Sequence, residues 1–186
     1  MPITPENASS PWHIVDPGED VPRCFNVIIE IPMGSSNKYE MDKKTGLLKL
    51  DRVLYSAVHY PANYGFIPQT LGEDGDPLDA LVLASSPVFP LTLVKARAIG
   101  LIKMRDRQEA DHKIIAVHAN DPEFDGYQQI YDLPAHRLAV LKRFFEDYKA
   151  LENKKVIVED LLPVDSALPI VEQGCAAYRA KFDALK

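Results

Sequence analysis

Hydrophobic and polar residues alternate through much of the first two thirds of the chain, a period of two that is typical of β-strands. In segment 25–31, Phe25 and the apolar residues at every second position after it share one face, and Glu30 lies on the other. The same pattern predicts further strands at residues 38–41, 47–54, 78–83, 91–104, 113–118 and 155–158. Gly46 closes a short polar run between the first two of these, which predicts a hairpin.

The spacing becomes helical near the end of the chain. Asp132 is expected to cap a first helix that has Pro134 in its first turn. Its apolar stripe is predicted to consist of Leu138, Leu141, Phe145, Tyr148 and Leu151. A second helix is expected from near Ser166, with the stripe Val171, Cys175, Tyr178, Phe182 and Leu185. Both stripes are typical of helices that pack on a sheet rather than of cofactor sites.

These elements predict a mainly β fold with two α-helices in the C-terminal half. Short strands with little helix between them favour a closed barrel over a doubly wound sheet. Prolines concentrate in residues 1–22, which we therefore interpret as an irregular N-terminal arm. Because no repeat and no linker-like change of composition divides the chain, residues 1–186 are expected to form a single domain.

Composition narrows the class of protein. A chain of 186 residues with 46% hydrophobic residues can bury a sizeable core. The 21 basic and 27 acidic side chains leave a net charge of −6, which argues against nucleic acid as a partner and suits a cation site. No segment has the length of a membrane span or the pattern of a secretory signal. Cys24 and Cys175 form neither a disulfide framework nor a metal motif, so a reduced, cytoplasmic protein is expected.

The most informative segment is 72–79, where Asp74, Asp76 and Asp79 fall within six residues. A glycine and a proline between them favour a turn that brings the three carboxylates together. Such carboxylates repel one another, so they need a hard divalent cation or must spread into water. From this segment alone, a metal site and a solvated turn are equally good interpretations. An EF-hand loop is disfavoured, because the required glycine and glutamate are absent from its sixth and twelfth positions.

A second acidic pair favours the metal site. Segments 100–104 and 113–117 resemble the arms of a hairpin, whose loop carries Asp106 and Asp111. These two side chains can face each other across the mouth of the hairpin. Alone they would be interpreted as an exposed loop, but beside the first cluster a shared metal site becomes competitive. Lys113, two residues after Asp111, would share its strand face if the strand already includes Asp111.

Cations and phenols accompany the carboxylates. The candidates are Glu30, Lys38, Glu40, Arg52, Tyr60, Tyr64, Lys113, Tyr148 and Lys149. A ladder of surface salt bridges and structural tyrosines is the simpler interpretation, and for Lys43 and Lys44 we adopt it. Together, however, these groups are the mixture that phosphoryl transfer needs, because carboxylates hold Mg²⁺ while cations and phenols hold phosphate oxygens. The sequence contains no Walker loop, no G-x-S-x-G elbow and no H-E-x-x-H motif.

The motifs in their order resemble family I soluble inorganic pyrophosphatases of the compact bacterial type, from about Pro22 to Leu151. Asp74-Gly-Asp-Pro-Leu-Asp79 fits the family signature D-[SGDN]-D-P-x-D. The accompanying motifs are Ile29-Glu-Ile-Pro32, Lys38-Tyr-Glu40, Asp51-Arg52, Tyr60-Pro-Ala-Asn-Tyr-Gly65, Lys103-Met-Arg-Asp106, Asp111-His-Lys113 and Phe144-Phe-Glu-Asp-Tyr-Lys149.

The resemblance implies roles for these residues in the hydrolysis of pyrophosphate to two orthophosphates by metal-activated water in direct in-line attack. Asp76 would accept the proton of the attacking water. The metals, Mg²⁺ with Mn²⁺ as a possible substitute, would be held by Asp74, Asp79, Asp106 and Asp111 with support from Glu30. Phosphate oxygens would be held by Lys38, Arg52, Tyr64, Lys113, Tyr148 and Lys149. Glu40 and Tyr60 would support these groups.

The resemblance also implies a five-stranded, twisted, closed OB-like β-barrel flanked by the two late helices, and a cytoplasmic homohexamer with no nucleic-acid or membrane partner. One departure from the family stands in the loop 106–111, where Arg107 and Ala110 replace acids that are common in relatives. Glu109 is a partial substitute. This departure affects the expected metal affinity but not the main assignment.

Three alternatives stay open at the level of sequence. A non-catalytic module for divalent cations or phosphate explains the carboxylates but not the cations and phenols around them. A nucleic-acid-binding OB barrel would share the fold, since fold does not determine function, but the net charge disfavours it. A phosphatase of the D-x-D-x-T class requires a threonine where this chain has Leu78.

Overall fold

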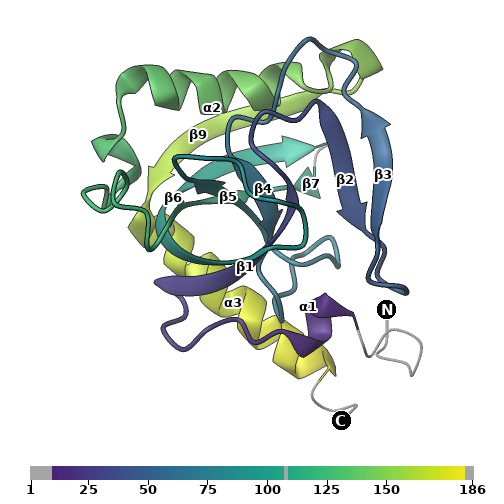
Figure 1. The fold of residues 1–186 in the computed structure, drawn as a ribbon, viewed down its shortest axis with the longest axis vertical. Coiled ribbons are helices and arrows are strands. Elements are labelled where there is room, and N and C mark those ends of the chain that lie inside the picture. The colour runs from purple at the N-terminus through teal and green to yellow at the C-terminus, as the bar shows by residue number, and fades with distance from the viewer. Residues whose placement is uncertain (1–9, 107–108, 183–186) are drawn as a thin grey trace.

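The computed structural model describes residues 10–106 and 109–182 (Figure 1). Its strands are β1 (Cys24–Ile31), β2 (Asn37–Met41), β3 (Leu48–Val53), β4 (Asn63–Phe66), β5 (Asp79–Leu83), β6 (Leu93–Asp106), β7 (Glu109–Ala110), β8 (Lys113–His118) and β9 (Val156–Pro163). The helices are α1 (Pro11–Ile14), α2 (Ala135–Asp147) and α3 (Val164–Phe182), with 3-10 turns η1 (Ile130–Asp132) and η2 (Ala150–Glu152).

Five strands form a closed ring in the order β1-β4-β5-β8-β6, because β6 pairs back with β1 (Figure 1). All of these pairings are antiparallel except that of β5 with β8. The 14-residue β6 closes the ring with its first half and carries β9 and the short β7 along its second half. The expected closed, five-stranded, mainly β fold is therefore confirmed. The hairpin of β2 and β3 forms a separate two-stranded sheet.

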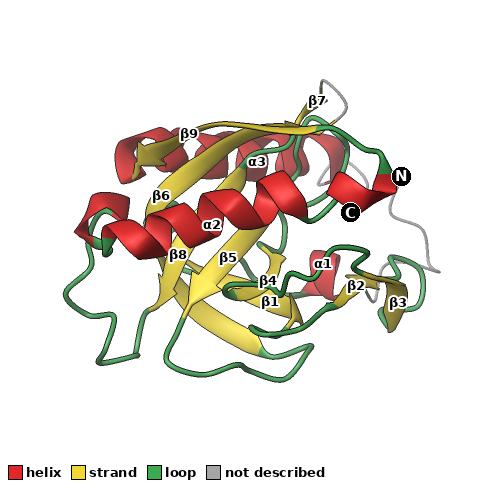
Figure 2. Cartoon of the chain, turned by 90° about the horizontal axis from the view of Figure 1, so that it is seen from above, coloured by secondary structure: helices red, strands yellow, loops and turns green. Residues whose placement is uncertain are grey.

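Both faces of the ring strands are buried, and each face packs against a different helix. Leu81 and Leu83 belong to the apolar cluster that contains Phe145 of α2. The alternate residues of the same strand, Ala80 and Val82, belong to the cluster that contains residues of α3. Figures 1 and 2 show the two helices on different sides of the ring. Burial on both faces explains the unbroken apolar runs 80–83 of β5 and 114–117 of β8.

Residues 60–65, where the sequence pattern predicted no strand, are partly strand. The structure forms β4 from Asn63, and all four of its residues are buried. The strand lies between β1 and β5, where its backbone groups are paired on both sides. This pairing comes from distant segments, so no local pattern revealed it. Similarly, β9 extends to Pro163, beyond the predicted end at residue 158, because it pairs along β6.

The predicted start of the first helix is wrong. Asp132 lies in η1, where its carboxylate accepts hydrogen bonds from the backbone N–H groups of Gln128 and Gln129, both at 2.8 Å. Helix α2 begins only after Pro134. Leu151, assigned above to the apolar stripe, lies in η2 and is 65% exposed.

The second helix, α3, begins at Val164, two residues before the predicted start. Leu185 lies outside the described residues. The helix buries Val171, Cys175, Tyr178 and Phe182, as the predicted stripe requires.

The N-terminal arm is not wholly irregular. Residues 11–14 form the short helix α1, which buries Trp12 to 2% exposure. The indole packs against Tyr178 and Phe182 of α3, with ring centroids at 6.1 and 5.6 Å. Burial of this large apolar ring anchors the arm to the C-terminal helix. Within the described residues, none of the helices has the length and hydropathy of a membrane span.

Candidate active site

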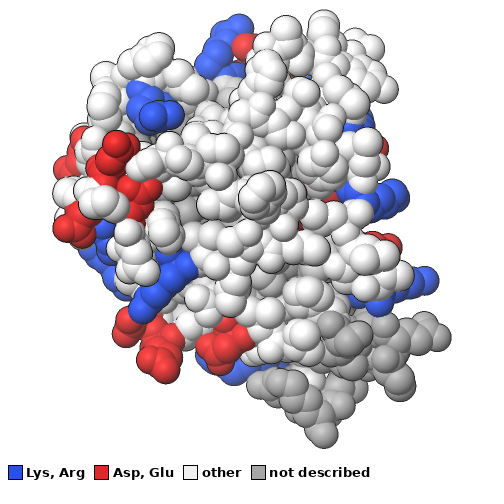
Figure 3. Space-filling view, viewed as in Figure 1, with Lys and Arg blue, Asp and Glu red and all other residues white. Residues whose placement is uncertain are grey.

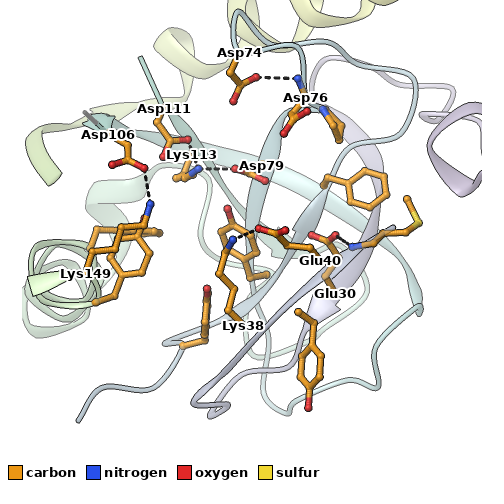
Figure 4. Close-up of a pocket in the computed structure, with 18 of the residues that line it drawn as sticks. Glu30, Lys38, Glu40, Asp74, Asp76, Asp79, Asp106, Asp111, Lys113 and Lys149 are labelled. Carbon is orange, nitrogen blue, oxygen red and sulfur yellow. Dashed lines mark hydrogen bonds and ion pairs between the residues drawn. The ribbon is translucent and has the colours of Figure 1, made fainter. Parts of the chain in front are cut away.

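A cavity of about 380 Å³ lies between the β2–β3 hairpin, the ring strands and the end of α2 (Figure 4). It collects nearly all of the residues that the sequence singled out. Those that line it are Glu30, Lys38, Glu40, Tyr60, Tyr64, Asp74, Asp76, Asp79, Asp106, Asp111, Lys113, Tyr148 and Lys149. Arg52 alone among the predicted residues is not part of this lining.

The loop between β4 and β5 carries the first acidic cluster. Gly75 has a φ of +87°, a left-handed conformation that favours glycine, and Gly72 donates its N–H to the carbonyl of Asp76 at 2.7 Å. The Asp74 carboxylate accepts the N–H of Asp76 at 3.0 Å, so it both closes the turn and borders the cavity. Burial raises the pKa of Asp74, and the N–H of Asp76 partly opposes this.

Lys113 is the buried counter-ion of two carboxylates (Figure 4). Its residue is 3% exposed, and Nζ donates to Asp79 Oδ2 at 2.5 Å and to Asp111 Oδ1. Burial lowers the pKa of the ammonium, but the charges of Asp79 and Asp111 outweigh it and raise the pKa above its ordinary value. The Asp111 and Lys113 side chains therefore meet, but not on one strand face as predicted, because β8 begins only at Lys113.

Lys149 forms a second, half-buried ion pair, with Asp106 Oδ2 at 2.5 Å. Burial lowers the pKa of Lys149, and the hydrogen bond to Asp106 opposes this change. The other oxygen of Asp106, Oδ1, is buried and has no hydrogen-bond partner. A buried carboxylate oxygen without a partner is costly, so this atom is a candidate ligand for a cation.

Glu30 reaches the cavity from β1 and is 8% exposed. Its Oε1 accepts the N–H of Met41 at 2.7 Å, which ties β1 to the end of β2. Burial raises the pKa of Glu30 to about 8, although the Met41 hydrogen bond opposes it. The side chain is therefore mostly protonated at pH 7, unless a cation approaches it.

Three buried phenols border the same cavity. The pKa values of Tyr60, Tyr64 and Tyr148 are all raised, because burial disfavours a phenolate and, for each, a neighbouring negative group adds to the effect. Their hydroxyls therefore stay protonated and can donate hydrogen bonds to an oxyanion. Aromatic contacts hold these rings in place. The ring centroid of Tyr60 lies 5.4 Å from that of Tyr64 and 4.8 Å from that of Phe144.

Lys38 and Arg52 occupy paired positions on β2 and β3. Lys38 pairs with Glu40 and lies 3.3 Å from Asp51 Oδ2. Arg52 donates from Nε to Glu152 Oε1 at 2.7 Å and also pairs with Asp51, so its contacts hold it beside η2. Its Nη2 is buried with no hydrogen-bond partner, which leaves one donor available.

The sequence did not indicate that Lys43 and Trp12 line the cavity. Lys43, interpreted above as a surface residue, borders the cavity and pairs with Asp76. Trp12, from the N-terminal arm, also lines the cavity. The tryptophan in the proline-rich arm could have indicated that this arm packs on the rest of the protein. No pattern near Lys43 indicates the direction of its side chain. Glu109 and Ala110 line the cavity as well, and Arg107 lies outside the described residues.

The carboxylates of the cavity have the donor atoms of a metal site but are not arranged as one. In residues 10–106 and 109–182, no three acidic, histidine or cysteine side chains are grouped around one point as metal ligands. Instead, Asp76, Asp79, Asp106 and Asp111 each face a lysine. All of the donors are oxygens, and Oδ1 of Asp106 lacks a partner. The donor chemistry therefore fits a hard divalent cation such as Mg²⁺, while the side-chain positions are those of an ion-paired pocket.

Carboxylates, ammonium groups and phenols converge beside a closed β ring, a combination that suits a polyanionic substrate accompanied by cations. The model of the inorganic pyrophosphatase family matches residues 27–179 of the chain. The chain therefore belongs to the inorganic pyrophosphatase family, a membership that implies a divalent metal cofactor.

Similar proteins agree with this family. The chain is 53% identical over 175 residues to soluble inorganic pyrophosphatase 2 of Chlamydomonas reinhardtii, which covers 94% of this chain and 91% of the relative. It is 56% identical to the soluble inorganic pyrophosphatase PPA1 of Solanum tuberosum, over 92% and 81% of the two chains. Among solved structures, the inorganic pyrophosphatase of Thermus thermophilus has a TM-score of 0.87 and 43% identity, and the match covers 93% of this chain and 99% of that one.

Proposed function

We propose that this chain hydrolyses pyrophosphate to two orthophosphates in the cavity lined by Asp74, Asp76 and Asp79. There, a water activated by divalent cations would attack one phosphorus of pyrophosphate directly and in line. The reaction is that of its family. The observation that supports the proposed site is the convergence of distant segments, because every predicted residue except Arg52 lines one cavity.

Asp74, Asp79, Asp106 and Asp111 would hold Mg²⁺, with Mn²⁺ as a possible substitute, and Glu30 would support them. Hard cations take carboxylate oxygens as ligands, and Mg²⁺ completes its shell with water and substrate phosphates. Bound there, such ions would lower the pKa of a coordinated water and neutralise phosphate oxygens.

Asp76 is assigned to accept the proton of the attacking water. Its side chain is 55% exposed and borders the cavity. Its backbone is fixed on both sides of Cα: its N–H donates to the Asp74 carboxylate, and its carbonyl accepts the N–H of Gly72. A carboxylate that a fixed backbone carries at the border of the cavity is placed to reach a water there.

Phosphate oxygens are assigned to the cations and phenols of the lining. Lys38, Lys113 and Lys149 supply positive charge, and Tyr64 and Tyr148 supply neutral donors. These groups stabilise the charge that develops on the leaving phosphate. Arg52 is assigned to the same task through its unpartnered Nη2, from a position beside the lining.

Two residues are assigned supporting roles. Glu40 holds the ammonium of Lys38, and Tyr60 packs its ring on Tyr64. We also propose that residues 1–186 form a single domain.

A cytoplasmic homo-oligomer, a hexamer by family resemblance, completes the proposal. Large apolar side chains exposed on the strands and loops support self-association, for example Phe89 at 87% and Tyr55 at 64% exposure. On the face seen in Figure 3, charged side chains gather at the margins, and the centre carries few. Neither nucleic acid nor a membrane is part of the proposal.

The test is phosphate release from pyrophosphate, with Mg²⁺ and then with excess EDTA. Release that EDTA abolishes is expected. Asp76→Asn should keep the fold and most of the metal binding but lose roughly a thousandfold in turnover, since general bases contribute about 10²–10⁴-fold. Near-normal turnover of this variant at pH 7 would remove Asp76 as the proton acceptor.

A further inference from the structure

The N-terminal helix, the hairpin turn and the acidic loop meet at one point of the cavity. Nζ of Lys43 lies 5.5 Å from the centroid of the Trp12 ring and pairs with Asp76 Oδ1. An ammonium within about 6 Å of an indole face is attracted by the ring. Trp12, Lys43 and Asp76 therefore form a continuous chain of contacts, although 31 and 33 positions separate its members in sequence.

The indole is held firmly enough to act as a platform. Trp12 Nε1 donates to the carbonyl of Thr70 at 2.9 Å. The hydroxyl of Thr70 accepts the N–H of Leu78 at 2.9 Å and donates to the carbonyl of Ile67 at 2.6 Å. Thr70 thus joins the platform to the loop that carries Asp76, because Leu78 lies within that loop.

The turn that carries Lys43 is also constrained. Asp42 accepts hydrogen bonds from the backbone N–H and the hydroxyl of Thr45, both at 2.8 Å. Gly46 has a φ of +69°, and a Cβ added there would lie 3.1 Å from Pro11 Cδ. The turn is therefore packed directly against α1, and its lysine is directed across the indole.

We propose that Trp12 and Lys43 are positioning residues, which hold the Asp76 carboxylate in the orientation that its chemistry needs. This inference rests on the proposed role of Asp76. A carboxylate that is 55% exposed would otherwise sample several rotamers, and a displacement of about 1 Å can cost roughly 100-fold in rate. The ion pair with a lysine that is itself held by an aromatic ring reduces this freedom.

The kinetic test compares Lys43→Met with Lys43→Arg and with Lys44→Met, a matched control whose lysine is the exposed neighbour in the same turn. Lys43→Met should lower kcat about tenfold and leave KM within about twofold, because the pair acts on the orientation of Asp76 and not on substrate binding. Lys43→Arg should recover most of kcat, Trp12→Phe should fall between wild type and Lys43→Met, and Lys44→Met should be unchanged. A raised KM with unchanged kcat in Lys43→Met would overturn the proposal, since Lys43 would then be a substrate ligand.

A second readout needs no activity. Trp12 is the single tryptophan of the chain, so the tryptophan fluorescence reports the surroundings of this one indole. In metal-free protein with EDTA, Lys43→Met and Asp76→Asn should each change the emission, and Lys44→Met should not. Unchanged emission in Lys43→Met would overturn the proposed chain of contacts. Near-normal turnover of Asp76→Asn would contradict the proposed role of Asp76. If Asp76→Asn is impaired but Lys43→Met turns over normally, only the inference about Lys43 and Trp12 is contradicted.

Discussion

Nζ of Lys113 lies 2.5 Å from Oδ2 of Asp79, across the parallel pair of β5 and β8. The lysine side chain is 4% exposed and the aspartate side chain 28%. The pair therefore lies where the buried interior of the ring meets the open cavity. A second contact with Asp111 makes one ammonium the counter-ion of two carboxylates. The stability of the ring and the charge of the site therefore depend on the same residue.

Lys113→Met should consequently destabilise the metal-free protein. Removal of one partner leaves Asp79 and Asp111 without their counter-ion, and the partial exposure of these carboxylates limits the expected loss to about 2–3 kcal/mol. Urea unfolding in EDTA measures it, with Lys142→Met, whose side chain is 47% exposed, as the control. Added Mg²⁺ should restore part of the loss. A Lys113→Met protein as stable as the wild type would contradict this account of the pair.

The pH dependence of stability should carry the signature of Glu30. Its folded pKa of about 8 lies above its ordinary value of 4.5, so the folded protein retains a proton that the unfolded chain releases between these values. Stability from this group is therefore complete below about pH 4.5 and is lost as the pH rises from there through about 8, in total by roughly 5 kcal/mol.

Glu30→Gln should flatten this slope, because the amide keeps an acceptor for the N–H of Met41 without an ionisable group. Unfolding in urea at several pH values between 5 and 9, in EDTA, is the measurement. The same slope in wild type and variant would show that another group is responsible.

Divalent cations should stabilise the folded chain. An ion that binds only the folded state adds about 2.7 kcal/mol at 100 times its dissociation constant. For a chain of this size that corresponds to a rise of roughly 5–10 °C in Tm. Asp79→Asn should lose most of this shift, and Asp125→Asn, an exposed acid away from the cavity lining, should retain it. Equal shifts in the two variants would place the stabilising ions elsewhere.

Gly65 should tolerate no side chain. A Cβ there would lie 1.9 Å from the carbonyl oxygen of Ile28 and 2.8 Å from Cα of Ile29, both backbone atoms of β1. Gly65→Ala should therefore cost at least about 3 kcal/mol, because the β1–β4 pairing must separate. Gly126→Ala, which would meet no atom within 4 Å, is the matched control in urea unfolding. Equal midpoints for the two variants would refute the close approach.

Much of the site could be predicted because its residues are arranged locally. The turn of segment 72–79 depends on Gly75 and on hydrogen bonds within a few residues. The alternation that places Glu30 opposite Phe25 is a property of any extended strand. Such local signals do not show which partners a side chain finds.

For that reason the orientation of Arg52 toward Glu152, a hundred positions away, was not foreseen. Asp132 was misassigned because it accepts local N–H groups in a 3-10 turn in the same way as a helix cap does.

The sequence by itself determined the strand-rich class, the two helices, the family motif and most of the charged and phenolic residues that line the cavity, because periodicity and turn chemistry act within a few positions. Only the tertiary structure decided that β6 closes the ring on β1, that β4 is a strand, and that Trp12 and Lys43 reach the cavity. These features arise when segments distant in sequence bury surface and pair charges against one another. The free energy of those contacts exists only in the assembled fold.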